Sequence, residues 1–234
     1  MSVFAIADTH LSLRVPKPMD IFGSRWNGWT EKLCENWRRT VNENDTVIIP
    51  GDISWAMTMD EAWDDLKLLD GLPGKKIIGR GNHDYWWGTL AKIEKFFFEA
   101  GITSIEVLHN NAFECEDAVI CGSRGWYIDE KNAPKDADYD KIVAREAARL
   151  EISLKAANAI DENKRKLAFF HFPPFFEPFA CRDIIDVLHK YGVKDCYYGH
   201  IHGKYAIPQQ AEFEGITFTL ISADYLDFTP YKIL

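Results

Sequence analysis

The stretch KIIGRGNHD, residues 76–84, decides the fold: a short apolar run ends in glycine and is followed by polar side chains. Four other apolar runs end in a similar way. They are Val3–Ala7 before Asp8-Thr9-His10, Thr46–Pro50 before Gly51-Asp52, Leu167–Phe170 before His171, and Cys196–Tyr198 before Gly199-His200-Ile201-His202. Residues just past the carboxyl ends of strands converge on one crevice in an open α/β sheet. We therefore expect Asp8, Asp52, Asn82 and the five histidines of these segments to lie together.

Segments with helical periodicity separate the apolar runs. Apolar residues recur at helical spacing from Trp26 to Val41, from Ala62 to Leu69, from Val143 to Ala157 and from Ile184 to Tyr191. Thr58 and Glu61 form a capping-box pattern ahead of the second helix, and Gly71 ends it. Strands that alternate with helices predict an α/β fold in which helices cover the strands.

The C-terminal part of the chain has a different pattern. Lys204–Pro208, Gly215–Ile221 and Pro230–Leu234 are predicted to be successive strands with short turns, which indicates an antiparallel edge or a second sheet. The chain has no internal repeat and no low-complexity linker. We therefore expect residues 1–234 to form a single domain.

Composition narrows the class of protein. The 234 residues are 47% hydrophobic and 14% aromatic, which is typical of a folded globular chain. Thirty-six acidic against 27 basic residues give a net charge of −9 without a basic cluster, and this disfavours nucleic acid as a partner. No apolar run is long enough to span a membrane and no signal pattern is present, so we expect a cytoplasmic protein. The five cysteines lack CxxC spacing and are expected to be reduced and buried.

The polar residues at the strand ends have the spacing of metal ligands. Asp8 and His10 are two residues apart, as are His200 and His202, so each pair is able to face one ion from an extended chain. Mixed nitrogen and oxygen ligands without thiolates favour Mn, Fe, Zn, Co or Ni. These polar side chains are too many for one tetrahedral ion, and the simplest interpretation is two ions that share a carboxylate ligand. His109 and His189 lack this context and are interpreted as structural.

The ordered set Asp8-x-His10, Gly51-Asp52, Gly81-Asn82-His83-Asp84, His171 and Gly199-His200-Ile201-His202 resembles the calcineurin-like metallophosphoesterase family. The match runs from residue 8 to residue 202, and its blocks follow the order of the family. Ala7 stands where the family often has serine, which is within its usual variation. The resemblance implies an α/β architecture of the metallophosphoesterase type, a β-sandwich of two mixed sheets flanked by helices, with the site at one edge of the sheets.

The resemblance also implies a role for each matching residue. The first ion would be held by Asp8, His10 and His202, the second by Asn82, His171 and His200, and Asp52 would bridge them. His83 would face the substrate as an acid or a phosphate contact. Asp84 would accept a hydrogen bond from His83 and set its tautomer.

These roles predict a hydrolase of phosphate esters. Two ions about 3.5–4 Å apart activate a hydroxide for attack on phosphorus and neutralise charge, without a covalent phosphoenzyme. Arg80 and Arg124, which follow apolar runs, are candidates for substrate binding, and so are the polar loops Ser12–Gly28 and Ser123–Asp140.

Other interpretations stay open at this level. A metal-binding scaffold without catalysis is the main alternative, whereas a structural zinc protein conflicts with the large set of nitrogen and oxygen ligands. The expected partner is a small-molecule phosphate ester. The sequence does not distinguish a monoester substrate from a diester substrate, and it does not give the oligomeric state.

Overall fold

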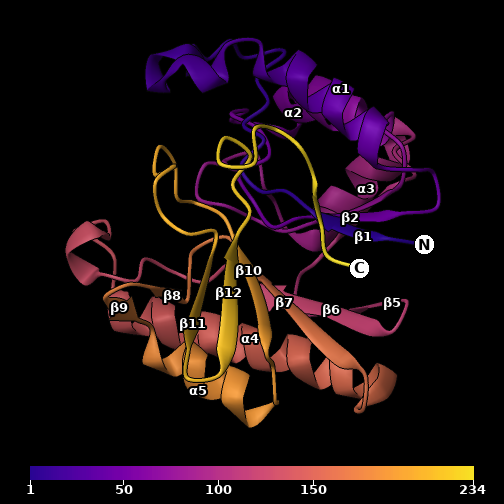
Figure 1. The fold of residues 1–234 in the computed structure, drawn as a ribbon. Helices are drawn as coiled ribbons and strands as arrows, with labels where there is room; N and C mark the ends of the chain where they lie inside the picture. The colour runs from indigo at the N-terminus through magenta and orange to yellow at the C-terminus, as the bar shows by residue number, and fades with distance from the viewer.

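Two β-sheets face each other in the centre of the molecule, and helices cover their outer faces, in the computed structural model of residues 1–234 (Figure 1). The strands are β1 (Val3–Ala5), β2 (Thr46–Ile49), β3 (Lys75–Ile78), β4 (Ile105–Val107), β5 (Phe113–Cys115), β6 (Ala118–Ser123), β7 (Arg165–Phe170), β8 (Phe175–Phe176), β9 (Phe179–Ala180), β10 (Asp195–Tyr198), β11 (Gln210–Phe213), β12 (Ile216–Leu220) and β13 (Tyr231–Lys232). The α-helices are α1 (Trp29–Thr40), α2 (Met59–Asp70), α3 (Leu90–Ala100), α4 (Tyr139–Asp161) and α5 (Arg182–Lys190), and Met19–Phe22, Ser24–Trp26 and Glu130–Asn132 form short 3₁₀ turns.

Both sheets are mixed, as the resemblance implies. The first has the order β13-β1-β2-β3-β4, in which β1 to β4 are parallel and β13 is antiparallel to β1. The second has the order β11-β12-β10-β7-β6-β5, with four parallel strands in the middle and an antiparallel strand at each edge. The parallel strands of each sheet therefore bring their carboxyl ends to one edge, where the site is expected.

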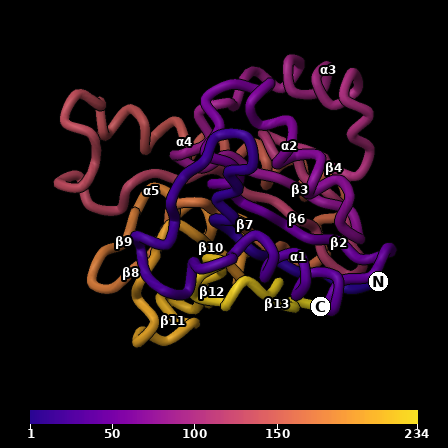
Figure 2. The backbone as a smooth tube through the Cα atoms, turned by 90° about the horizontal axis from the view of Figure 1, so that it is seen from above, coloured from indigo at the N-terminus to yellow at the C-terminus, as the bar shows by residue number.

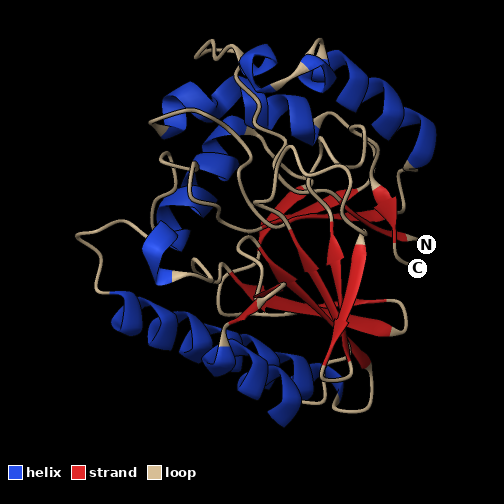
Figure 3. Cartoon of the chain, turned by 60° about the vertical axis from the view of Figure 1, so that its left-hand side comes forward, coloured by secondary structure: helices blue, strands red, loops and turns tan.

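Alternation along the strands explains why each sheet is covered on both faces. In β1, Val3 and Ala5 join the core between the sheets, whereas Phe4 packs in the core beneath the N-terminal helices. In β7, Phe169 lies between the sheets and Phe170 packs in the core beneath the other helices. Successive side chains of a strand point to opposite faces, so runs that are apolar throughout are buried on both sides. Figure 3 shows the resulting order of layers, with helices on both sides of the strands.

The helices occur where periodicity predicts them, with one addition. α1, α2, α4 and α5 cover the four predicted segments, and the Thr58–Glu61 capping box is present at the start of α2. α3 is the addition, and its buried residues Ile93, Phe97 and Ala100 lie at helical spacing. Of the consecutive phenylalanines Phe96, Phe97 and Phe98, only Phe97 is buried.

One predicted strand is wrong. Lys204–Pro208 forms turns, and the edge strand β11 begins later, at Gln210. The segment has a single long aliphatic side chain, Ile207, and it lies between the end of β10 and the start of the β11–β12 hairpin. The other two C-terminal strands are present as β12 and β13, although β12 runs parallel to β10.

The two ends of the chain lie side by side. β13 pairs with β1, so the C-terminus returns to the strand that begins the fold (Figure 1). Seen from above, the segment between β6 and α4 projects from the body of the molecule (Figure 2). None of the helices is both long enough and apolar enough to cross a membrane.

Candidate metal centre

The predicted ligands meet at the edge where the parallel strands of both sheets end. Their backbone is unusual, because Asp8, His10, Asp52 and His200 have φ values of 60°, 45°, 51° and 68°. Positive φ is uncommon for residues other than glycine and is costly to maintain. Four such residues in one place indicate that the placement of the side chains, and not a low backbone conformational energy, determines the local structure.

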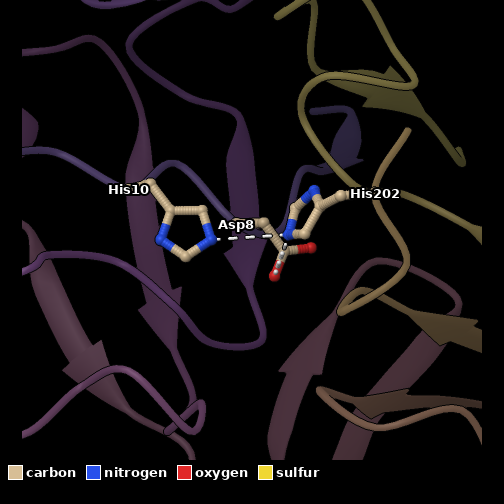
Figure 4. A group of neighbouring side chains, drawn as sticks. All are labelled: Asp8, His10 and His202. Carbon is tan, nitrogen blue, oxygen red and sulfur yellow. Dashed lines mark hydrogen bonds and ion pairs between the residues drawn. The ribbon is translucent and has the colours of Figure 1, made fainter. Parts of the chain in front are cut away.

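Asp8, His10 and His202 form one cluster, which we call the first half of the site (Figure 4). The Nε2 atoms of His10 and His202 lie 3.4 Å apart, and His202 Nε2 is 3.6 Å from Asp8 Oδ1. Figure 4 shows the two imidazole rings facing each other next to the carboxylate. The three side chains therefore converge on one point from the segment after β1 and from the loop after β10.

Asp52, Asn82 and His171 form the second half of the site. His171 Nε2 lies 2.7 Å from Asn82 Oδ1 and 3.5 Å from Asp52 Oδ2. The ring of His200 lies 5.2 Å from that of His171, between centroids, but His200 belongs to neither cluster of potential ligand atoms.

The carboxylates of Asp8 and Asp52 connect the two halves. Asp8 Oδ1 is 3.7 Å from His171 Nδ1, and Asp8 belongs to both clusters. Asp52 Oδ2 is 3.7 Å from His10 Nε2, besides its approach to His171. Each carboxylate thus faces one histidine from each half, which is the arrangement that two neighbouring ions require.

Glycines allow the loops to approach this closely. A Cβ atom on Gly81 would collide with the carboxylate and backbone of Asp52, and a Cβ atom on Gly199 would lie 2.5 Å from Asp8 Oδ2. Both positions therefore require glycine for close approach. This explains the glycines that precede Asn82 and His200 in the sequence.

Burial keeps most of the imidazoles neutral. The pKa of His10 lies well below the usual range because of burial and, next, the neighbouring His202. The pKa of His171 is likewise well below this range because of burial and, next, the neighbouring His200. Burial lowers the pKa of His200 to about 4. Burial also lowers the pKa of His202, but the facing carboxylates of Asp8 and Asp224 outweigh this and raise it to about 10. Burial, Asp84 and Asp8 raise the pKa of Asp52 well above its usual range.

The residues fit metal ions on two grounds. Asp8 Oδ1, His10 Nδ1 and His171 Nδ1 are buried atoms without a hydrogen-bond partner in the protein. Buried polar atoms normally have partners, so such a group requires an explanation. The donor set consists of carboxylates, imidazoles and an amide, whereas all five cysteines are free, buried and outside the clusters. This chemistry suits a borderline divalent ion, and it accommodates two.

Ser222 and Asp224 support the first half, and sequence reasoning missed both. Asp224 Oδ1 lies 2.8 Å from His202 Nδ1, and the Ser222 hydroxyl donates to Asp8 Oδ2 at 2.8 Å. Such outer partners fix the orientation of metal ligands. The signal was available, because Ser222 and Asp224 follow the apolar run of β12 as the other site residues follow theirs.

The contact expected between Asp84 and His83 is absent. The buried carboxylate of Asp84 instead accepts hydrogen bonds from the backbone N–H groups of Asp52 (2.9 Å), Ile53 (2.8 Å), Ser54 (3.3 Å) and Gly81 (2.7 Å), and from Trp86 Nε1 (3.1 Å). These five donors, four of them backbone N–H groups, occupy its oxygens, so Asp84 connects the loops that carry Asp52 and Asn82. It does not orient the His83 ring.

His83 lies beside the clusters without belonging to them. Its ring is 4.3 Å from that of Trp55, which stacks on His10 at 4.9 Å, and its Nδ1 is buried without a partner. Burial lowers the pKa of His83. The Nζ of Lys17 lies 4.5 Å from the centroid of the Trp55 ring, so the loop Ser12–Gly28 borders the site.

A mostly apolar pocket of about 320 Å³ adjoins His200. Tyr127, Phe172 and Phe176 contribute to its walls, and Tyr127 comes from the loop Ser123–Asp140. Both predicted polar loops therefore border the metal centre. Arg80 and Arg124 line a different pocket, which holds none of the predicted metal ligands.

Comparison with known proteins agrees with this geometry. The family model for calcineurin-like phosphoesterases matches residues 1–204. The structure of the phosphopantetheinyl hydrolase from Mycobacterium tuberculosis is 16% identical, with 100% of this chain and 95% of that chain covered and a TM-score of 0.61. The protein TT1561 of Thermus thermophilus is 11% identical, with coverages of 99% and 97% and a TM-score of 0.56. At these identities the structures show a shared fold. A search of curated protein sequences found no match.

Proposed function

Because the chain belongs to the calcineurin-like phosphoesterase family, we propose that it hydrolyses phosphate esters with the help of two divalent metal ions. One observation carries the proposal: two buried clusters of ligand atoms share Asp8 where the parallel strands of both sheets end. The hydrolase from Mycobacterium tuberculosis, with the same fold, supports the class of reaction.

The proposed ligands follow the two halves of the site. Asp8, His10 and His202 would hold one ion, Asn82, His171 and His200 would hold the other, and Asp52 would contact both. When bound, the ions supply Lewis acidity for the phosphoryl oxygens and lower the pKa of the attacking water. The buried neutral imidazoles offer their lone pairs without first losing a proton, which favours metal binding.

His83 is proposed as the hydrogen-bond donor to the substrate. It lies outside both clusters, Trp55 holds its ring, and Nδ1 has no protein partner. An N–H of this ring would donate to an oxygen of the ester, at the leaving group or at the phosphate. The pocket next to His200 would receive an apolar part of the leaving group.

The proposal is tested on one sample of the full chain that is treated with a chelator and then restored with Mn, Fe, Zn, Co or Ni. Metal content per chain is measured together with hydrolysis of p-nitrophenyl phosphate and bis-p-nitrophenyl phosphate. We expect about two ions per chain and metal-dependent turnover, and the preferred ester will separate a monoesterase from a diesterase.

Two results would contradict the proposal in different ways. A failure to bind any metal after restoration would refute the assignment of the ligands. Two bound ions without turnover of these or other phosphate esters would favour the metal-binding scaffold over the hydrolase.

A further inference from the structure

A second pocket, of about 410 Å³, lies next to the metal centre and is lined by none of the proposed metal ligands. Pro50, Arg80 and Phe169 line it, and each precedes a proposed ligand by two residues in the chain. The backbone carbonyl of Arg124, another lining residue, accepts the N–H of His171 at 3.2 Å. The pocket and the metal centre are therefore neighbours with separate walls.

The walls of this pocket carry an excess of positive charge. Arg80, Arg124, Arg145 and Arg149 all line it, against one carboxylate, Glu146. Glu146 is fully buried and pairs with Arg149 at 2.7 Å and with Arg145 at 3.7 Å. In a protein whose net charge is −9, this is a local concentration of the opposite sign.

Two of the four guanidinium groups form no salt bridge within the protein. No carboxylate lies within 4.0 Å of the side chain of Arg80 or Arg124, and neither side chain donates a hydrogen bond to another residue. Arg124 lies 4.7 Å from the ring centroid of Trp126, and its Nε is buried without a partner. Burial lowers the pKa of Arg124 to about 10, so the group stays charged at neutral pH.

The N-terminal end of α3 adds to the positive field. Thr89 and Leu90 line the pocket, and the Thr89 side chain does not cap the helix. The first turn of α3 contains no acidic residue. The free N–H groups at the start of a helix attract anions, and this end of α3 contributes Thr89 and Leu90 to the same pocket as the arginines.

We propose that this pocket binds a phosphate group or a similarly charged oxyanion. Guanidinium groups form paired hydrogen bonds to phosphate oxygens, and a concave site with one sign of charge concentrates the opposite ion. The anion comes from one of two sources, a second phosphate on the substrate or free phosphate. The first source rests on the proposed function, whereas the binding of an anion does not.

Binding is tested by calorimetric titration of inorganic phosphate into the full chain, both metal-loaded and chelator-treated. The double variant Arg145→Gln/Arg149→Gln removes two charges from the pocket. Its control, Lys141→Gln/Lys155→Gln, removes two charges from the same helix outside the pocket. We expect the dissociation constant of the chelator-treated protein to rise at least about tenfold in the first variant and to stay within about twofold in the control.

A second variant guards against misfolding, because loss of Arg149 leaves the buried Glu146 without its close partner. Arg80→Gln removes an exposed guanidinium that makes no hydrogen bond within the protein, and it should also weaken phosphate binding. Phosphate binding that is absent, or that none of the arginine substitutions changes, would overturn the proposal.

The source of the anion is tested by comparing 1,6-hexanediol bisphosphate with hexyl phosphate. If the second phosphate of a substrate occupies the pocket, the metal-loaded protein has at least about tenfold higher kcat/KM for the bisphosphate, and Arg80→Gln brings the ratio close to one. A ratio near one in the unsubstituted protein, with arginine-dependent phosphate binding, would assign the pocket to free phosphate. Arginine-dependent binding without hydrolysis of any ester would refute the proposed function and leave the anion pocket in place.

Discussion

The first half of the site, around Asp8, His10 and His202, is held by residues from the C-terminal segment, whereas the second half is held by its own loops. His202 is fixed by Asp224 and Asp8 by Ser222, both of which follow β12. In the second half, Asn82 contacts His171 directly, and Asp84 connects the Asp52 and Asn82 loops. The supports of the first half lie beyond residue 204, where the family match ends. One half of the centre is therefore stabilised by residues that lie outside the stretch matched by the family model.

Asp52→Asn should have the largest effect, because this carboxylate faces histidines of both halves. We expect both ions to be lost or weakened together and turnover to fall to background, more than the about 10–100-fold change typical of outer partners. Metal analysis and p-nitrophenyl phosphate hydrolysis measure this. Asp117→Asn, an exposed carboxylate, is the control. Loss of a single ion would contradict contact with both.

His83→Ala tests a residue that belongs to neither half. Metal content should stay at two ions, while turnover falls about 10²–10⁴-fold if His83 acts as a general acid. The loss should be larger for phenyl phosphate than for p-nitrophenyl phosphate, whose leaving group requires less protonation. Loss of an ion from a folded variant would make His83 a ligand.

Asp84→Asn tests the internal support of the second half. The substitution replaces one carboxylate oxygen, which accepts hydrogen bonds from backbone N–H groups, with an NH₂ group. Buried N–H donors then face another donor and lose their acceptor. We expect the free energy of unfolding to fall by about 2–4 kcal/mol, measured by urea denaturation. Unchanged stability with lost activity would instead support the orientation of His83 that the resemblance implied.

Asp224→Asn tests the external support of the first half. Metal affinity should fall about 10–100-fold for one ion, with the other retained, because Asp224 contacts only the first half. Electron paramagnetic resonance of Mn-loaded protein would then change from a coupled pair toward an isolated ion. Asp227→Asn, which is exposed and three residues further along, should preserve the coupled signal. Equal loss of both ions would remove the distinction between the halves.

Ser222→Ala should have the smallest effect. It removes one hydrogen bond to Asp8 Oδ2, which still accepts the N–H of His200 at 2.9 Å. The free energy of unfolding should fall by about 1 kcal/mol, and metal affinity should fall less than in Asp224→Asn. Thermal unfolding and metal titration give the two values. A larger effect than that of Asp224→Asn would reverse the order of importance of the two supports.

The alternation of strands with helices and the polar strand ends are predictable because apolar runs and their polar ends are local signals, whereas the sandwich of two sheets is implied by the family resemblance. α3 is not predicted, although its buried residues Ile93, Phe97 and Ala100 have helical spacing; of the three consecutive phenylalanines beside them, only Phe97 is buried. Lys204–Pro208 is wrongly predicted to be a strand, because its composition does not reveal that the edge pairing begins at Gln210. That the chain forms a single domain stays a prediction.

The sequence predicts the role of a site residue only where the residues that contact it are also close to it in the sequence. Asp84 follows His83, but three of its five partners are consecutive backbone amides about 30 residues earlier, which no local pattern reveals. The pocket lined by Arg80 and Arg145 likewise brings together distant parts of the chain.

His10 and His202 are 192 residues apart in the sequence, although their Nε2 atoms lie 3.4 Å apart. This separation sets the order in which the two halves of the site are completed during synthesis. Asp52, Asn82 and His171, the residues of the second half, are all synthesised before His202. The first half has to wait for His202 and its support Asp224, which are made afterwards. A newly made chain therefore acquires its paired centre only after translation has passed these residues, and premature termination between residues 172 and 201 leaves the complete second half with a first half that lacks His202.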